Sequence, residues 1–148
     1  KNSGLIPILE NEVLVKKKPI LGICLGMQLF FQSSEESKIN GLGWINGKIK
    51  KFNFRNKDKL YRVPHMGWNT IQTTNHSPLI NNIDKDAKFY FAHSYYLLSK
   101  DNLDIVATTS HKIKFTSIIN KKNIFGTQFH PEKSHKSGLT LLSNFNQI

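Results

Sequence analysis

The sequence predicts an α/β domain whose sheet is mostly parallel and carries a β-rich insertion. Two short apolar runs, Ile20–Ile23 and Ile124–Phe129, have the continuous hydrophobicity of strands that are buried on both faces. The first run leads into a turn bounded by glycines, and Ser137–Phe145 carries apolar residues at helical spacing. The region between them is rich in glycine, aromatic and β-branched residues, which is typical of short strands and turns.

The remaining elements follow from local patterns, taken in chain order. Residues 6–15 alternate apolar and acidic side chains, which indicates a helix that ends before the turn at Lys16–Pro19. The apolar stretch Met27–Phe31 predicts a helix after the glycine-bounded turn, extending at most to Ser34. Strands are predicted within residues 48–54, 63–71 and 88–93, and residues 105–109 are predicted to pair with residues 115–119.

Length and composition indicate one domain over residues 1–148, large enough to bury a core. No apolar run approaches the roughly 18 residues of a membrane helix, so we expect no membrane span. The single cysteine excludes an internal disulfide and a cysteine-rich zinc site, and a free thiol suits a reducing cytoplasm. The chain starts at Lys1 without a secretory signal and reads there as the middle of a longer sequence, so we expect a domain that is incomplete at its N-terminus.

The formal net charge of +11 raises nucleic-acid binding as a competing function from a different class. All but two of the 21 basic residues are lysines, however, whereas arginine is favoured for bidentate contacts to phosphate and guanine. The lysines are also dispersed, with local clusters at residues 16–18 and 48–62. We therefore expect no nucleic-acid partner, and the abundance of Lys, Asn and Ile indicates a general compositional bias.

Cys24, the only cysteine, lies in the run Gly22-Ile-Cys-Leu-Gly26, between the apolar strand and the helix-compatible stretch. By analogy with Gly-x-Ser-x-Gly, this setting predicts a nucleophile elbow that presents the sulfur at the end of a strand. The N-terminus of the following helix is expected to lower the pKa of the thiol and to offer backbone N–H groups to a developing oxyanion. The alternative is a buried cysteine that acts as a small hydrophobic residue, and the flanking glycines favour the nucleophile.

His130 and Glu132 follow the second apolar strand and form a candidate base with an orienting carboxylate. In extended geometry, residues two apart project to the same side of the chain, and Pro131 restricts the backbone between them. An imidazole held by a carboxylate is suited to accept a thiol proton and to return it to a leaving amine. A His-Pro-Glu tripeptide alone is more often a solvated strand end, and its combination with the cysteine elbow is what indicates catalysis.

These motifs, in this order, resemble those of the class I (triad-type) glutamine amidotransferases. The resemblance rests on Gly22–Gln28 and Gly126–Glu132. More narrowly, three blocks resemble the glutaminase subunit of imidazole glycerol phosphate synthase: Val63–Asn69, Tyr90–Tyr96 and His130–Ser134. The implied fold is flavodoxin-like. Members of that family usually carry a βαβ portion with a glycine-rich loop before the nucleophile. The sequence has no match to this portion, so we expect the loop that supplies a second oxyanion N–H to lie outside residues 1–148.

The resemblance implies hydrolysis of glutamine to glutamate and ammonia through a thioester on Cys24. His130 would protonate the departing ammonia, Glu132 would orient His130, and the backbone N–H of Leu25 would be one oxyanion donor. The residues implied to bind glutamine are Leu25, Gln28, Ser94 and Tyr95. The residues implied to lie toward a partner and the ammonia exit are His65, Trp68, Asn69, Tyr90 and Lys133.

The implied partner is a (β/α)₈-barrel cyclase in a heterodimer. It would use the ammonia to make imidazole glycerol phosphate and an aminoimidazole carboxamide ribonucleotide in histidine biosynthesis. This chemistry implies no cofactor, and the histidines show no metal-ligand spacing with carboxylates. Three alternatives stay open: a paralogous glutaminase that feeds a sugar amidotransferase in surface polysaccharide synthesis, a cysteine hydrolase without an ammonia partner, and a catalytically silent interaction domain.

Overall fold

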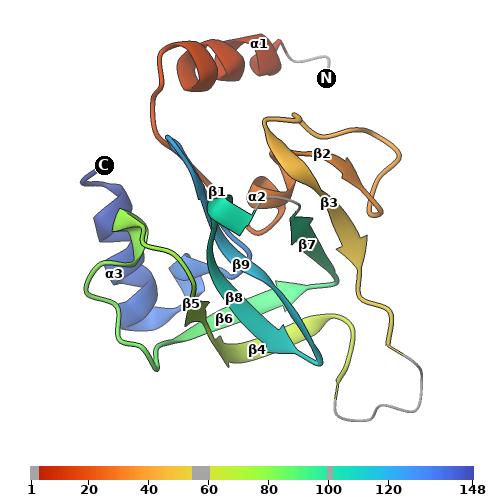
Figure 1. Cartoon of the computed structure of the whole chain (residues 1–148), viewed down its shortest axis with the longest axis vertical. Coiled ribbons are helices and arrows are strands. Elements are labelled where there is room, and N and C mark those ends of the chain that lie inside the picture. Colours follow the sequence, from red (N-terminus) through yellow and green to blue (C-terminus); the bar gives the residue numbers. More distant parts are fainter. Residues whose placement is uncertain (1–3, 55–60, 100–101) are drawn as a thin grey trace.

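The computed structural model describes residues 4–54, 61–99 and 102–148, whose strands form an eight-stranded and a two-stranded sheet (Figure 1). Residues 1–3 and part of the basic stretch 48–62 lie outside the described residues. The helical segments are α1 (Leu5–Glu10), the π-helix η1 (Asn11–Val15), α2 (Leu25–Leu29), the 3₁₀ helices η2 (Pro78–Ile80), η3 (Asn102–Asp104) and η4 (Pro131–Lys133), and α3 (His135–Phe145). The strands are β1 (Ile20–Ile23), β2 (Phe31–Ser34), β3 (Ile45–Lys51), β4 (His65–Thr70), β5 (Gln72–Thr73), β6 (Lys88–His93), β7 (Tyr95–Ser99), β8 (Ile105–His111), β9 (Ile113–Lys121) and β10 (Ile124–Thr127).

Most of the predicted elements are confirmed. The N-terminal helix is present as α1 followed by η1, and the buried strand before the cysteine is β1. The strand predicted at residues 88–93 is β6, and the predicted strand pair is β8 with β9. The last apolar run contains β10, and the C-terminal helical face belongs to α3.

The large sheet runs in the order β1-β10-β9-β7-β3-β2, with β8 beside β9 and β5 beside β8. Strand β1 pairs with β10 in parallel, as does β2 with β3, whereas the other paired neighbours are antiparallel. The described sheet is therefore mixed rather than mostly parallel. Two of the antiparallel pairs have a local cause, because turns at Lys112 and at residues 122–123 connect β8 to β9 and β9 to β10, and connections this short make antiparallel hairpins.

The helix after the cysteine turn is shorter than predicted. It ends at Leu29, and Phe31–Ser34 is strand β2, paired in parallel with β3. Phe31 is fully buried in a core cluster with Ile45 of β3 and Leu97 of β7. Phenylalanine has only a modest helix preference, so burial of this side chain on the sheet decides the local structure.

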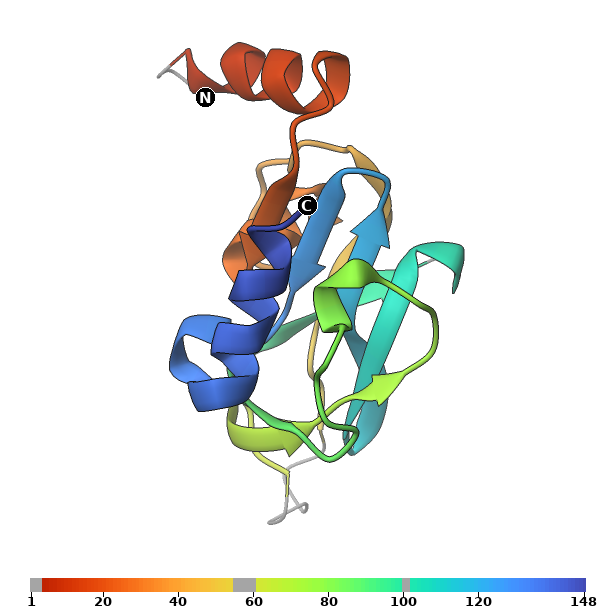
Figure 2. The same ribbon diagram turned by 90° about the vertical axis from the view of Figure 1, so that its left-hand side faces the viewer.

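A second core cluster joins β6 and α3 to the large sheet. The rings of Phe89 and Phe129 stack with their centroids 4.1 Å apart, and Leu141 of α3 is fully buried in the same cluster. This packing anchors the segment between β10 and α3. By contrast, α1 has no buried residue and stands away from the rest of the molecule in both ribbon views (Figures 1 and 2). No helix in the described part of the chain has the length and apolar character needed to cross a membrane.

The parallel pair β1–β10 brings the two sequence motifs together. In its register Ile23 lies opposite Thr127, and the backbone N–H of Cys24 extends the pairing by donating to the carbonyl oxygen of Thr127 at 2.7 Å. Neighbouring parallel strands have their carboxyl ends at the same edge of a sheet, so the cysteine turn and the His130 segment emerge at one edge.

Candidate active site

Cys24 occupies a strained turn between β1 and α2. Its backbone dihedral angles are φ 51° and ψ −107°, a combination that a non-glycine residue seldom adopts and that concentrates at functional sites. A Cβ atom on Gly22 would lie 2.6 Å from the backbone nitrogen of Met27, so the close approach of strand and helix requires glycine there. The predicted elbow geometry is therefore present.

The thiol of Cys24 is half-buried, and this burial raises its pKa above the ordinary value. Hydrogen bonding from the backbone N–H of Leu25 and from the side chain of Gln128 opposes the shift, whereas the negative charges of Glu36 and Glu132 add to it. The prediction that the helix N-terminus would give a low thiol pKa is therefore wrong for this structure. Helix α2 has only five residues, and the cost of desolvation is the larger effect.

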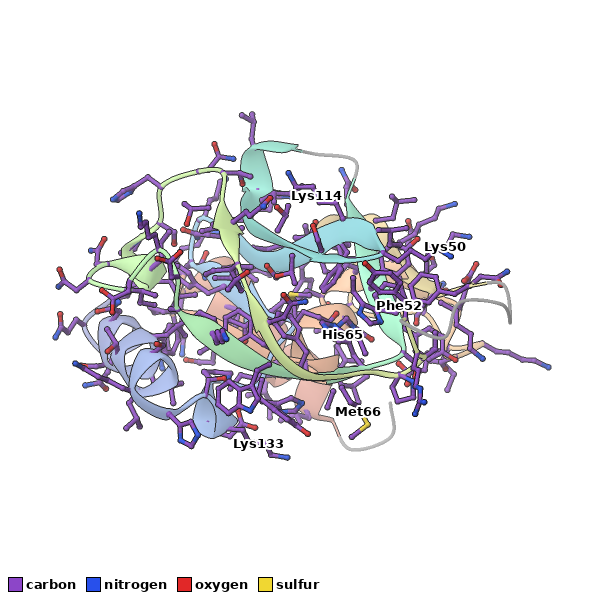
Figure 3. The ribbon with its side chains drawn as sticks, turned by 90° about the horizontal axis from the view of Figure 1, so that it is seen from below. Lys50, Phe52, His65, Met66, Lys114 and Lys133 are labelled. Atoms are coloured by element: carbon purple, nitrogen blue, oxygen red, sulfur yellow. The ribbon has the colours of Figure 1, made fainter. Side chains whose placement is uncertain are left out.

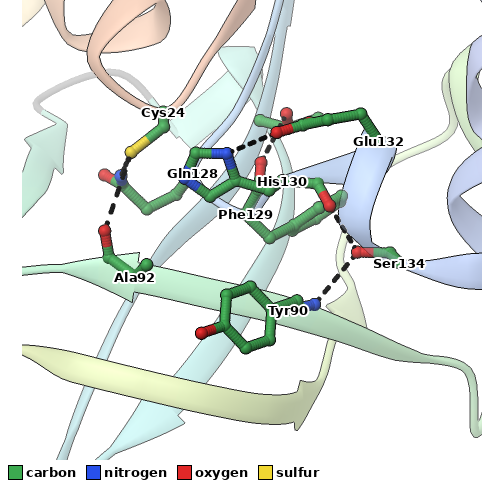
Figure 4. Close-up of polar contacts among 9 residues, drawn as sticks. Cys24, Tyr90, Ala92, Gln128, Phe129, His130, Glu132 and Ser134 are labelled. Carbon is green, nitrogen blue, oxygen red and sulfur yellow. Dashed lines mark hydrogen bonds and ion pairs between the residues drawn. The ribbon is translucent and has the colours of Figure 1, made fainter.

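Two further groups, Ala92 and Gln128, are hydrogen-bonded to the sulfur beside the N–H of Leu25 (Figure 4). The sulfur donates to the carbonyl oxygen of Ala92 at 4.0 Å and accepts from Gln128 Nε2 at 3.7 Å. Within the described residues, no hydrogen bond joins the sulfur to the ring of His130. The thiol proton must therefore turn away from Ala92 before His130 can accept it.

The ring of His130 is held by Glu132. The distance between His130 Nδ1 and Glu132 Oε1 is 2.7 Å, which assigns a hydrogen to Nδ1 and leaves Nε2 as the acceptor of the neutral ring. Figure 4 shows Nδ1 turned to the carboxylate and the other edge of the ring turned toward the side where Cys24 lies. The expected extended geometry is wrong, because residues 131–133 form the 3₁₀ helix η4, and this turn brings the carboxylate back to the ring.

The backbone of His130 is fixed from two sides. Its N–H donates to the carbonyl oxygen of Tyr90 at 2.9 Å. The hydroxyl of Ser134 donates to the carbonyl oxygen of His130 at 2.6 Å and accepts from the N–H of Tyr90 at 3.0 Å. Helix α3 packs tightly against the same turn, since a Cβ atom on Gly138 would lie 1.9 Å from the carbonyl oxygen of Pro131. The turn that carries His130 is thus rigidly held.

A cavity of about 270 Å³ opens beside Cys24. It is lined by Cys24, Leu25, Gln28, Glu36, Pro64, Met66, Ala92, His93, Ser94 and Tyr95. All four residues that the sequence assigned to glutamine binding are among them. Gln28 is buried, and its Nε2 donates to the carbonyl oxygen of Tyr95 at 3.2 Å and to Gln128 Oε1 at 3.0 Å. Both hydrogens of that amide are used internally, so only its carbonyl oxygen is left to contact a substrate.

The residues assigned to a partner interface do not share one environment. Trp68 and Lys133 are exposed, and Asn69 and Tyr90 are half-buried. The indole of Trp68 stacks on the ring of His135 with centroids 4.9 Å apart. His65, in contrast, is buried inside the molecule, whereas Met66 and Lys133 lie toward its edge (Figure 3), so His65 is not a surface residue.

Sequence reasoning missed a buried pair formed by His65 and His93. His65 Nδ1 lies 3.0 Å from His93 Nε2, and His93 Nδ1 lies 2.7 Å from the carbonyl oxygen of Tyr95. Burial, with a smaller contribution from neighbouring histidines, lowers the pKa of His65 to about 3 and that of His93 to about 4. Both rings are therefore neutral near neutral pH. Gln128 and Ser134 were also missed, because their contacts depend on the tertiary fold.

Within the described ranges, no group of three or more His, Cys, Asp or Glu side chains is arranged to hold a metal ion. The site is thus a cysteine at a strained elbow, a histidine oriented by a glutamate, and a cavity lined by amide, hydroxyl and backbone groups.

The fold is that of a glutamine amidotransferase. The class-I glutamine amidotransferase family model matches residues 5–147, and the chain belongs to this family. It is 46% identical over 97% of its length to the imidazole glycerol phosphate synthase subunit HisH of Leptospira borgpetersenii. It is 48% identical over 98% of its length to subunit HisH 2 of Methanococcus maripaludis. The chain spans 70% of each of these relatives, and the similarity groups it with the HisH subunits.

Solved structures support the fold independently of close sequence similarity. One crystal structure of a glutamine amidotransferase matches with a TM-score of 0.67 at 12% identity, over 97% of this chain and 69% of that one. A glutamine amidotransferase from Thermotoga maritima matches with a TM-score of 0.58 at 16% identity, over 97% of this chain and 53% of that one. The class I glutamine amidotransferase fold expected from the sequence is confirmed.

Proposed function

We propose that the chain is a glutaminase that releases ammonia from glutamine for a synthase partner. The observation that carries the proposal is the convergence of Cys24, in its strained elbow, with the hydrogen-bonded pair His130 and Glu132 at one edge of the β1–β10 pair. The cavity beside the sulfur has the size of a small polar substrate. The similarity to HisH subunits supports the choice of substrate.

The residues suit acyl transfer through a thioester. His130 Nε2 takes the proton of the Cys24 thiol, and the thiolate attacks the side-chain carbonyl carbon of glutamine. A C–S bond forms, the C–N bond breaks, and the proton on His130 passes to the departing ammonia. Water, deprotonated by the same ring, then cleaves the thioester to give glutamate and the free thiol. We assign the backbone N–H of Leu25 to the stabilisation of the oxyanion, and Glu132 to the stabilisation of the imidazolium that forms in each step.

The partner follows from the relatives' names, which describe one subunit of imidazole glycerol phosphate synthase. We infer that the ammonia passes to a (β/α)₈-barrel cyclase subunit in the cytoplasm, for histidine biosynthesis. The exposed aromatic and cationic side chains of Trp68 and Lys133 lie on the β4 and η4 side of the molecule and are suited to such an interface.

An assay of glutamate release tests the proposal. It uses the full-length chain, with and without the cyclase subunit and its nucleotide substrate. We expect release in the complex and its loss in the Cys24→Ala variant. Release that survives in this variant would contradict the role of the thiol. Turnover that is equally fast without the cyclase would favour a free hydrolase, and no release with any partner would favour a silent interaction domain.

A further inference from the structure

Gln128 contacts the reacting sulfur from the interior of the protein. It directly follows β10, and its side chain is fully buried, with 0% exposure. Its Nε2 donates to Cys24 Sγ at 3.7 Å, and its Oε1 accepts from Gln28 Nε2 at 3.0 Å. A buried amide is costly unless both of its ends are hydrogen-bonded. One end of this amide is bonded to the nucleophile and the other to a residue that lines the cavity.

The carbonyl oxygen of Tyr95 determines how both amides are oriented. This oxygen can only accept, and it accepts from Gln28 at 3.2 Å, so Gln28 must direct its NH₂ group inward. The second hydrogen of that group needs an acceptor, and Gln128 Oε1 provides it. Gln128 must then direct its own NH₂ group toward the sulfur of Cys24. The donor role of Gln128 therefore follows from a backbone atom and not from a choice between two similar amide orientations.

We propose that Gln128 is a positioning residue of the glutaminase reaction, whose N–H stabilises the thiolate of Cys24 and ties the nucleophile to Gln28 in the substrate cavity. The proposal rests on the function proposed above. When the thiol gives its proton to His130, its hydrogen bond to Ala92 is lost and the sulfur becomes an acceptor only. A neutral donor facing an anionic sulfur then makes a charge-assisted bond, which is stronger than its bond to the thiol.

A donor of this kind is needed because the sulfur is half-buried. Desolvation disfavours the thiolate, and the carboxylates of Glu36 and Glu132 disfavour it further. Gln128 lowers the cost of the thiolate charge with a neutral N–H donor and adds no charged group beside the sulfur. A purely structural Gln128 would hold Gln28 in place but would leave the ionisation of the thiol unchanged.

The pH dependence of Cys24 alkylation by iodoacetamide separates these two roles, because the thiolate is the reactive form. The measurement uses the full-length chain and needs neither glutamine nor a partner. Gln128→Met keeps the size of the side chain and removes both hydrogen bonds. We expect the midpoint of the alkylation profile to rise by about one pH unit, with a roughly tenfold lower rate near pH 7. Gln128→Leu serves as the second variant if the thermal unfolding midpoint shows that the Met variant is not folded.

Thr127→Val is the matched control. Thr127 precedes Gln128 and is equally buried. The substitution removes the hydrogen bond from the Thr127 hydroxyl to the carbonyl oxygen of Phe129, which does not involve the sulfur. We expect this variant to keep the wild-type alkylation profile. A folded Gln128 variant with the wild-type profile would overturn the proposal, as would an equal shift in Thr127→Val. A shift confined to Gln128, in a chain that releases no glutamate, would support the role of Gln128 at the thiol and count against the proposed function instead.

Discussion

Glu132 Oε1 lies 2.7 Å from His130 Nδ1, within a 3₁₀ turn that starts directly after the histidine. The bond sets the tautomer of the ring and leaves Nε2 as the proton acceptor. The backbone of the same turn is held by Tyr90 and Ser134. The orientation of the His130 ring is thus fixed by the turn at residues 130–134, and this turn is anchored to β6 through Tyr90.

Glu132→Gln should lower the turnover of glutamine by about a hundredfold or more, with a smaller change in KM. The amide oxygen can still accept from Nδ1, but the negative charge that stabilises the imidazolium is lost. Steady-state kinetics of glutamate release measure both parameters. Glu35→Gln is the matched control, because it removes an exposed carboxylate that pairs with Lys50. Turnover within twofold of the wild type would contradict the role given to Glu132.

Gly138→Ala should lower both stability and activity. The added methyl group would lie 1.9 Å from the carbonyl oxygen of Pro131, so helix α3 and the His130 turn must move apart. We expect a loss of about 1–3 kcal/mol in the free energy of unfolding, together with slower glutamate release. Gly26→Ala is the control for stability, since its Cβ atom would meet nothing within 4 Å. Equal unfolding midpoints for the two variants would show that the predicted clash is absent.

The free energy of unfolding should fall as the pH drops below about 6.5. The folded-state pKa of His65 is about 3 and that of His93 about 4, below the ordinary value of 6.5, so the unfolded chain takes up protons that the folded chain excludes. Their contribution to stability is fully present above about pH 6.5 and is lost as the pH falls toward the folded values. Each histidine contributes a slope of at most about 1.4 kcal/mol per pH unit.

Urea unfolding between about pH 7.5 and pH 5 measures this slope. His65→Gln should make it shallower, because glutamine does not bind a proton in either state. A variant whose stability depends on pH as steeply as that of the wild type would show that His65 does not contribute to the slope.

Trp68→Ala should weaken binding of the cyclase subunit by about tenfold or more, because exposed tryptophans often dominate interfaces. Trp68 is 45% exposed, and its indole contacts His135 and Tyr90, so we expect a stability loss of about 1 kcal/mol. Lys133→Ala should weaken binding with still less effect on stability. Leu98→Ala, at an exposed apolar residue of β7 in the other sheet, is the control. A large stability loss with unchanged binding would make Trp68 a core residue.

The sequence predicted the parts of the fold that depend on local pattern. The apolar runs predicted β1 and β10, and the glycines around Cys24 predicted the elbow. Both patterns lie within a few residues of sequence. The helix predicted through Phe31 ended early because that side chain is buried on the sheet. The sheet is mixed instead of mostly parallel. The short hairpins at Lys112 and at residues 122–123 set the directions of β8, β9 and β10, and the antiparallel pairs of β7 with β3 and β9 join strands that are distant in sequence.

Within the site, residue types were easier to predict than their environments. The sequence identified Cys24 and His130, but the raised pKa of the thiol depends on burial that only the tertiary fold creates. The burial of His65 arises in the same way, from the pairing of β4 with β6. The role inferred for Gln128 depends on the carbonyl oxygen of Tyr95, which is distant in sequence. No local pattern contains that contact.

Labelling with a glutamine-like electrophile, followed by peptide mapping, tests the central role of Cys24 most directly. The full-length chain, bound to the cyclase subunit, would be treated with the reagent in the presence and absence of glutamine. We expect one modification, on Cys24, that is slowed by glutamine and absent from the Cys24→Ala variant. Modification at any other residue, or glutamate release that continues after Cys24 is fully labelled, would contradict the assignment of Cys24 as the nucleophile.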